Sequence, residues 1–111
     1  MIYIVTRHRG ALDWLKEQVS APALHLAHLM PEYAIGRGDT VVGTLPINLV
    51  ADICLRGARY FHLEICLPHA LRGQELSACQ LTEHGARLVE YFVHRPCPDE
   101  WILSRGGEQE D

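Results

Sequence analysis

Short apolar runs alternate along this chain with longer stretches in which apolar residues recur every three or four positions. Residues 2–6 (Ile-Tyr-Ile-Val-Thr) are a compact apolar run, which is typical of a buried strand. In residues 11–19 the apolar side chains follow helical spacing, and polar side chains fill the other face. The whole pattern predicts strands at residues 2–6, 23–29, 40–43, 59–67 and 86–94, and helices at residues 11–19, 46–56 and 78–84. Gly57 is expected to end the second of these helices, and Ser77 to cap the third.

Strands that alternate with helices indicate an α/β protein with a small Rossmann-like open sheet, mostly parallel and flanked by helices. The chain has 111 residues, which is enough for one hydrophobic core but not for two. We therefore expect a single domain over residues 1–103, with residues 31–38 as a connector. Residues 104–111 are polar and acidic, and we expect a disordered tail there.

The stretch from Gly38 to Asn48 combines a short strand, a small-residue turn and a helix start. Its β-branched residues favour a strand, and Pro46 is tolerated in a first helical turn because its missing N–H would be unpaired there anyway. Thr44 or Leu45 is expected near the N-cap. Unpaired N–H groups at such a helix start make an anion-binding site in outline.

Charge and composition narrow the classes of function. The formal net charge is −4, whereas a general nucleic-acid binder is usually basic, so we expect no binding of duplex nucleic acid and a local patch for any phosphate ligand. No run of 18 apolar residues and no signal peptide is present, which favours a cytoplasmic protein that is not in a membrane.

The four cysteines, Cys54, Cys66, Cys79 and Cys97, are scattered without a C-x-x-C pair. Free thiols are the simplest interpretation in a reducing compartment. Zinc bound by some of the seven histidines has no motif behind it, since structural zinc sites usually show close ligand pairs. No metal site is predicted.

In a mostly parallel sheet, three turns are expected to meet at the carboxyl edge of the strands: residues 7–10, 43–48 and 68–73. Ligands of such sheets bind in the crevice at that edge. Neither a G-x-G-x-x-G motif nor a P-loop is present, which argues against a dinucleotide cofactor. The ligand that these turns favour is an anion that carries phosphates.

The first turn carries Arg7 and Arg9, whose guanidinium groups match phosphate oxygens. His8 could move a proton near neutral pH, and Gly10 would let the backbone approach a ligand closely. The alternative is that both arginines are solvated loop cations and that His8 is structural.

The other two turns offer Thr44, Asn48 and Arg72. The Thr44 hydroxyl could bind a ligand or only cap the helix. The Asn48 amide both donates and accepts hydrogen bonds, as an adenine edge or a ribose requires. His25 and His28 could face solvent or contact a ligand, whereas His62, His69, His84 and His94 are expected to be structural.

Several motifs together resemble one known family, the short Csx-sixteen proteins encoded beside type III CRISPR systems. The resemblance spans about residues 1–95, and residues 43–49 are its most specific part. Arg9 departs from it, since proline is expected there. The motifs are residues 6–11 (Thr-Arg-His-Arg-Gly-Ala), Trp14, residues 38–49 (Gly-Asp-Thr-Val-Val-Gly-Thr-Leu-Pro-Ile-Asn-Leu), residues 57–60 and 62–63, and residues 72–77 (Arg-Gly-Gln-Glu-Leu-Ser).

This resemblance implies a CARF-like fold and a ring nuclease that works as a homodimer without metal or cofactor. Such a protein cleaves a cyclic oligoadenylate messenger, here cyclic tetra-adenylate, when a ribose 2′-hydroxyl attacks the adjacent phosphate. A non-catalytic sensor or sponge for the same ring, or a regulator of the CRISPR complex, are the alternatives. The implied catalytic residues are Arg7, His8 and Asn48, and the implied ligand-binding residues are Arg9, Gly10, Gly43, Thr44, Leu45, Pro46 and Arg72.

Overall fold

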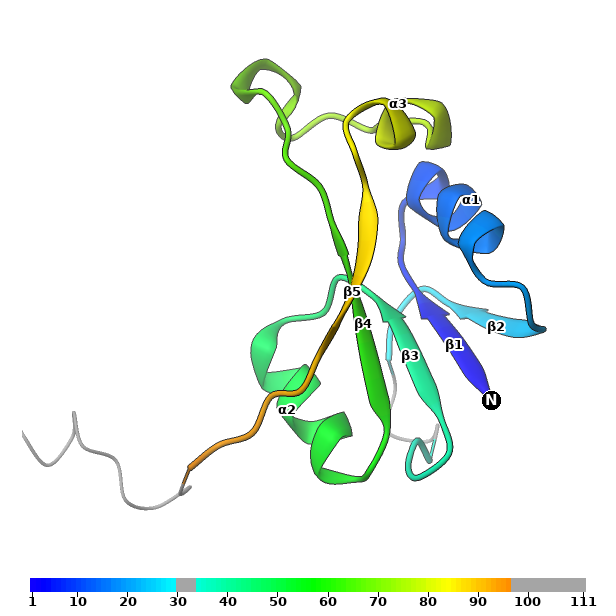
Figure 1. Ribbon diagram of the computed structural model, residues 1–111, viewed down its shortest axis with the longest axis vertical. Helices are drawn as coiled ribbons and strands as arrows, with labels where there is room; N and C mark the ends of the chain where they lie inside the picture. The colour runs from blue at the N-terminus through cyan, green and yellow to red at the C-terminus, as the bar shows by residue number, and fades with distance from the viewer. Residues whose placement is uncertain (30–33, 97–111) are drawn as a thin grey trace, which may run out of the picture.

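The computed structural model describes residues 1–29 and 34–96, and these form an α/β domain (Figure 1). Cys97 and the expected tail lie outside the described residues, as does much of the connector at residues 31–38. No helix in the described ranges is long and apolar enough to cross a membrane. The elements are β1 (Ile2–Val5), α1 (Arg9–Gln18), β2 (Ala23–Leu26), β3 (Thr40–Gly43), α2 (Ile47–Leu55), β4 (Arg59–Glu64), the short 3-10 helix η1 (His69–Leu71), α3 (Ala78–Glu83) and β5 (Arg87–Tyr91).

One five-stranded sheet organises the domain, in the order β2-β1-β3-β4-β5. The first four strands are parallel to one another, whereas β5 returns antiparallel to β4. The prediction of an open, mostly parallel α/β sheet is therefore confirmed. Because β1, β2 and β3 are in register, with Val5 opposite both Leu26 and Gly43, these strands end at the same level.

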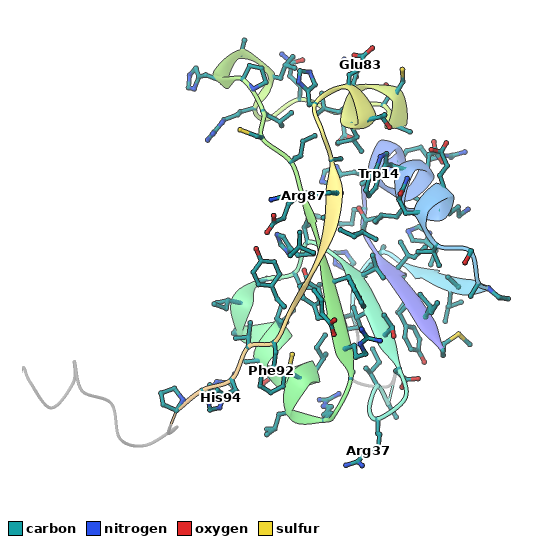
Figure 2. The ribbon with its side chains drawn as sticks, viewed as in Figure 1. Trp14, Arg37, Glu83, Arg87, Phe92 and His94 are labelled. Carbon is teal, nitrogen blue, oxygen red and sulfur yellow. The ribbon has the colours of Figure 1, made fainter. Side chains whose placement is uncertain are left out.

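Helices cover both faces of the sheet, and alternate residues of each strand point to opposite helices. Ile4 and Val42 pack in a core with Trp14 and Leu15 of α1, and α3 lies beside α1 on this face (Figures 1 and 2). Val5 and its neighbours pack on the other face against α2. That second core is formed by Val5, Leu26, Ile35, Val41, Val50, Ile53, Cys54, Ala58 and Tyr60, which are all buried.

The ends of two helices follow their sequence signals. Ser77 caps α3: its hydroxyl accepts from the Gln80 N–H at 3.1 Å while the Gln80 side chain accepts from the Ser77 N–H at 2.9 Å. Gly57 follows α2 with φ +96°, a backbone conformation that residues with a Cβ rarely adopt. The predicted cap at Ser77 and the predicted terminal glycine at residue 57 are both confirmed.

Strand lengths differ most from the sequence pattern, because apolar runs continue past the last hydrogen-bonded residue. The predicted strand at residues 59–67 ends at Glu64, and that at residues 23–29 ends at Leu26. The predicted strand at residues 86–94 is shorter at both ends, as β5 covers Arg87–Tyr91. The helices at residues 11–19 and 46–56 were each misplaced by one or two residues, a common uncertainty at helix ends.

Candidate functional site

The carboxyl ends of β1, β2 and β3 surround one pocket of about 440 Å³, which we call the edge pocket. Strand β1 runs directly into residues 6–8, β2 into residues 27–29, and β3 into residues 44–46. The parallel register places these three segments side by side. The edge pocket is lined by Val5, Thr6, Arg7, His8, Ala27, His28, Leu29, Thr44, Leu45, Pro46 and Leu49.

Gly43 lets β3 end close against β1. A Cβ added to Gly43 would lie 2.3 Å from the carbonyl oxygen of Val5, which is far inside van der Waals contact. A larger residue would push the Thr44–Pro46 turn away from Thr6 and Arg7. Gly43 itself does not line the edge pocket. Its lack of a side chain shapes that pocket indirectly, because it allows β3 to pack closely against β1.

A buried tyrosine holds the turn that follows β3. The Tyr60 hydroxyl donates to the carbonyl of Gly43 at 3.0 Å and accepts from the N–H of Leu45 at 2.8 Å. The Tyr60 side chain is 1% exposed, and burial raises its pKa to about 12, so the hydroxyl keeps its proton at neutral pH. Tyr60 thus fixes both ends of the turn.

Helix α2 begins beside the edge pocket without a side-chain cap. Thr44 and Leu45 lie near the N-cap as predicted, but the N-cap residue is Pro46, which was expected in the first helical turn. Proline has no side-chain oxygen to accept from the first N–H groups, and the first turn holds no acidic residue. The helix start therefore has N–H groups without a side-chain acceptor and a partial positive charge, features that favour an anion.

Arg7 and Arg9 differ in both position and partners. Arg7 is exposed, lines the edge pocket, and has no ion-pair partner for its guanidinium among residues 1–29 and 34–96. Arg9 lies in α1 outside this pocket, and its Nε is 3.3 Å from the carboxylate of Asp13. The structure therefore brings Arg7 to the pocket with no compensating charge from the described residues, and leaves Arg9 paired on the helix surface.

His8 borders two pockets. Besides the edge pocket, it lines a smaller one of about 160 Å³ that also includes Glu75. Its Nδ1 is 2.6 Å from Oε2 of Glu75, a distance typical of a charge-assisted hydrogen bond. In neutral His8 the proton must be on Nδ1 to make this bond, because a carboxylate only accepts. Nε2 is then left with a lone pair that can take a proton.

Besides Arg9 and Gly43, three further predicted site residues do not line the edge pocket. Gly10 is buried in α1, where an added Cβ would lie 1.7 Å from the carbonyl oxygen of Leu76, so its small size serves helix packing. Asn48 is exposed and lines none of the three pockets, and its carbonyl accepts from Arg95 at 3.4 Å. Arg72 follows η1, which is far from the strand ends in Figure 1.

The sequence interpretation missed two residues that organise this region, Glu75 and Tyr60. Glu75 lies 67 residues from its partner His8, and nothing in the local pattern connects them. In the sequence Tyr60 resembles any aromatic strand residue. Its role depends on the position of its hydroxyl, which bonds the backbone of Gly43 and Leu45.

No metal centre is evident in the described ranges. No group of three or more His, Cys, Asp or Glu residues there could hold a metal ion. Cys54, Cys66 and Cys79 are free thiols, in agreement with the sequence interpretation. His28 lines the edge pocket, whereas Nε2 of His25 donates to the Thr6 carbonyl at 2.9 Å.

Comparison with known proteins identifies one family. The model of the family described as "Putative CRISPR-associated protein (Cas_VVA1548)" matches residues 3–94, which cover the described strands and helices except Ile2, the first residue of β1. No curated protein and no solved structure matches the chain.

Proposed function

Since the chain belongs to this CRISPR-associated family, we propose that it is a ring nuclease of type III CRISPR signalling. Its substrate is a cyclic oligoadenylate, with cyclic tetra-adenylate as the leading candidate. Cleavage removes the messenger and switches the antiviral response off. The resemblance of residues 43–49 to the Csx-sixteen proteins supports the activity, and the edge pocket supports the class of ligand.

One observation supports this proposal most directly: Arg7 and the uncapped start of α2 border the same pocket. A cyclic oligoadenylate has one negative charge per phosphate, and both features favour a phosphate. The guanidinium offers paired N–H donors, and the helix start offers backbone N–H donors with no competing side chain. The Thr44 hydroxyl adds a donor on the same wall.

The proposed reaction is an in-line transesterification that uses the ribose next to the phosphate. The 2′-oxygen bonds to phosphorus, the bond from phosphorus to the 5′-oxygen breaks, and the product ends in a 2′,3′-cyclic phosphate. In this proposal Nε2 of His8 takes the 2′-hydroxyl proton, and Glu75, bonded to Nδ1, orients the imidazole ring and stabilises the imidazolium. The leaving 5′-oxygen takes a proton from water or from that imidazolium. Arg7 stabilises the extra negative charge at phosphorus.

A symmetric ring suits a symmetric binding site. We propose that two copies of the chain form a homodimer and that the ring lies across the two-fold axis, so that each edge pocket receives one phosphate. This arrangement doubles the cationic donors around one ring, which a chain of net charge −4 needs locally.

The test is an incubation of purified protein with labelled cyclic tetra-adenylate in excess EDTA. Linear products that end in a cyclic phosphate are expected. Binding without turnover would instead support a sponge that sequesters the ring. The absence of both binding and turnover would overturn the proposal.

Four single variants sharpen the assignment of the site. We expect Arg7→Ala and His8→Ala to lower turnover at least tenfold, and the matched variant Arg9→Ala to keep most of it, because Arg9 is paired with Asp13. Asn48→Ala tests the role implied by the resemblance. Full turnover in both Arg7→Ala and His8→Ala would contradict the placement of the reaction in the edge pocket.

A further inference from the structure

A second and larger pocket, of about 630 Å³, lies on the other side of the turn that Tyr60 holds. We call it the β4–β5 pocket, since most of its floor comes from these strands. Leu45 belongs to the walls of both pockets, so the turn after β3 is their common partition. The apolar wall of the β4–β5 pocket includes Ile47 and Val50 of α2, and the floor of this pocket includes the rings of His62 and Tyr91.

The hydrogen bonds of the Tyr60 hydroxyl determine the tautomer of His62. This hydroxyl has one proton, which it donates to the Gly43 carbonyl, and it already accepts from the Leu45 N–H. Nδ1 of His62 lies 2.7 Å from the same oxygen. With the single proton in use, the remaining lone pair must accept, so His62 carries its proton on Nδ1. Nε2 of neutral His62 is therefore an unprotonated acceptor.

The charged groups of this pocket compensate one another, unlike Arg7 in the edge pocket. Glu64 forms an ion pair with Arg87 at 3.4 Å and accepts a hydrogen bond from the Tyr91 hydroxyl. Arg87 projects from the upper part of β5 in Figure 2, beside β4. The group that fits such a wall is neutral, has an apolar surface, and offers a donor to Nε2 of His62.

The aromatic side chains give the floor a shape suited to a flat ring. The ring centroid of His62 is 5.7 Å from that of Tyr60 and 5.8 Å from that of Tyr91, and the latter pair meets edge to face at 82°. Flat heteroaromatic bases stack on rings of this kind, and contact with the aliphatic side chains of α2 would cover the second face.

We propose that the β4–β5 pocket is a subsite for a purine nucleoside, with His62 as the residue that reads the base. The exocyclic amine donates to Nε2 of His62, and the attached phosphate lies toward the start of α2, whose residue Ile47 borders the pocket. The choice of adenine among purines rests on the proposed function. A ring nucleotide would then reach across the partition, with phosphate on one side and base on the other.

Adenosine 5′-monophosphate is a suitable probe, because it tests the subsite without any cleavage. Titration of the full chain, labelled with ¹⁵N in its histidines, should shift the Nε2 resonance of His62. Purine riboside 5′-monophosphate lacks the exocyclic amine and should bind about three- to tenfold more weakly, as for one lost hydrogen bond.

His62→Phe keeps a flat ring but removes the acceptor, and it should weaken binding by the same factor. His69→Phe is the control, since His69 lies in η1 and lines none of the three pockets. If His62→Phe does not fold, as judged by circular dichroism, the comparison of the two nucleotides on the unmodified chain decides the question.

The two proposals fail separately. Equal affinity for the two nucleotides, no binding of adenosine 5′-monophosphate at millimolar concentration, or perturbation confined to the edge pocket would overturn the subsite. Cleavage of cyclic tetra-adenylate could still proceed in each case. A nucleotide that perturbs His62 in a protein unable to cleave the ring would support the subsite and contradict the proposed function.

Discussion

The two pockets on either side of Leu45 share a wall but differ in how their charges are satisfied. In the edge pocket Arg7 has no ion-pair partner among the described residues, and the adjacent helix start has no side-chain cap. In the β4–β5 pocket Glu64 is paired with Arg87 and bonded by Tyr91, and one neutral ring nitrogen is left as acceptor. A pocket with a cation that no described residue pairs favours an anionic ligand, whereas a pocket whose charged side chains pair with one another favours a neutral aromatic ring.

Because Leu45 lines both pockets, we expect the turn after β3 to affect both of them. Substitutions that move it should damage both pockets, and substitutions in one wall should affect one pocket. The predictions below follow from that distinction.

Gly43→Ala should have the largest effect, because its Cβ would meet the Val5 carbonyl at 2.3 Å. Strand β3 must shift, so we expect the free energy of unfolding, measured by urea denaturation, to fall by about 3 kcal/mol. We also expect ligand binding to be lost at both pockets. Gly36→Ala is the matched control: its Cβ would lie 3.5 Å from the Arg56 carbonyl, an ordinary contact. Equal stability of the two variants would contradict the close approach of β3 to β1.

Stability should fall with increasing pH above the usual pKa of tyrosine, because of Tyr60. Its folded-state pKa is raised from 10.0 to about 12 by burial, so the stabilising contribution is complete below pH 10 and is lost as the pH rises toward 12. Two pKa units correspond to about 2–3 kcal/mol, which urea denaturation at pH 9, 10, 11 and 12 should detect. Tyr60→Phe should show a smaller fall over this interval, and an identical fall would assign the titration to other groups.

Arg7→Ala should weaken binding at the edge pocket and leave the β4–β5 pocket unchanged. We expect binding of cyclic tetra-adenylate to weaken about ten- to a hundredfold and to depend less on salt, while adenosine 5′-monophosphate still perturbs His62. Isothermal titration at two salt concentrations measures both effects. Arg9→Ala controls for net charge, and the same loss in that variant would mean that a general field binds the ring.

Glu64→Gln should have the smallest effect and sharpens the comparison. The Glu64 side chain is 26% exposed, and the hydrogen bond from the Tyr91 hydroxyl is the main reason that the pKa of Glu64 is lowered. An amide oxygen can still accept from Tyr91, so the thermal midpoint should change little. Arg87 would lose its partner, however, and the binding of adenosine 5′-monophosphate should become more dependent on salt. Unchanged salt dependence would show that Arg87 does not face the ligand.

The fold was largely predictable, because hydrophobic period and turn residues act locally. The run from Thr40 to Gly43 and the cap at Ser77 each depend on neighbours in sequence, and both were found where expected. The antiparallel direction of β5 was not indicated, since alternation of side chains is the same in both directions. Strand ends were overestimated where apolar residues continue beyond Glu64 into a pocket wall.

The site was predictable only in part, because its geometry depends on distant partners. The βα corners indicated that Arg7 and Thr44 would meet, and the parallel register brings them together. The partner of His8 could not be inferred, since Glu75 follows another strand and another turn. The positions of hydroxyl groups, such as that of Tyr60, depend on tertiary packing rather than on residue type.

Because the start of α2 has no side-chain cap, binding of an anion there would affect the lifetime of the protein. The first N–H groups of α2, those of Ile47 and Asn48, have no acceptor within the helix, and Pro46 supplies none from its side chain. An anion bound there stabilises the native state by mass action and so reduces the population open to proteases. Under the proposed function that anion is the cyclic oligoadenylate, so a high concentration of it would lengthen the lifetime of the protein and its cleavage would shorten that lifetime.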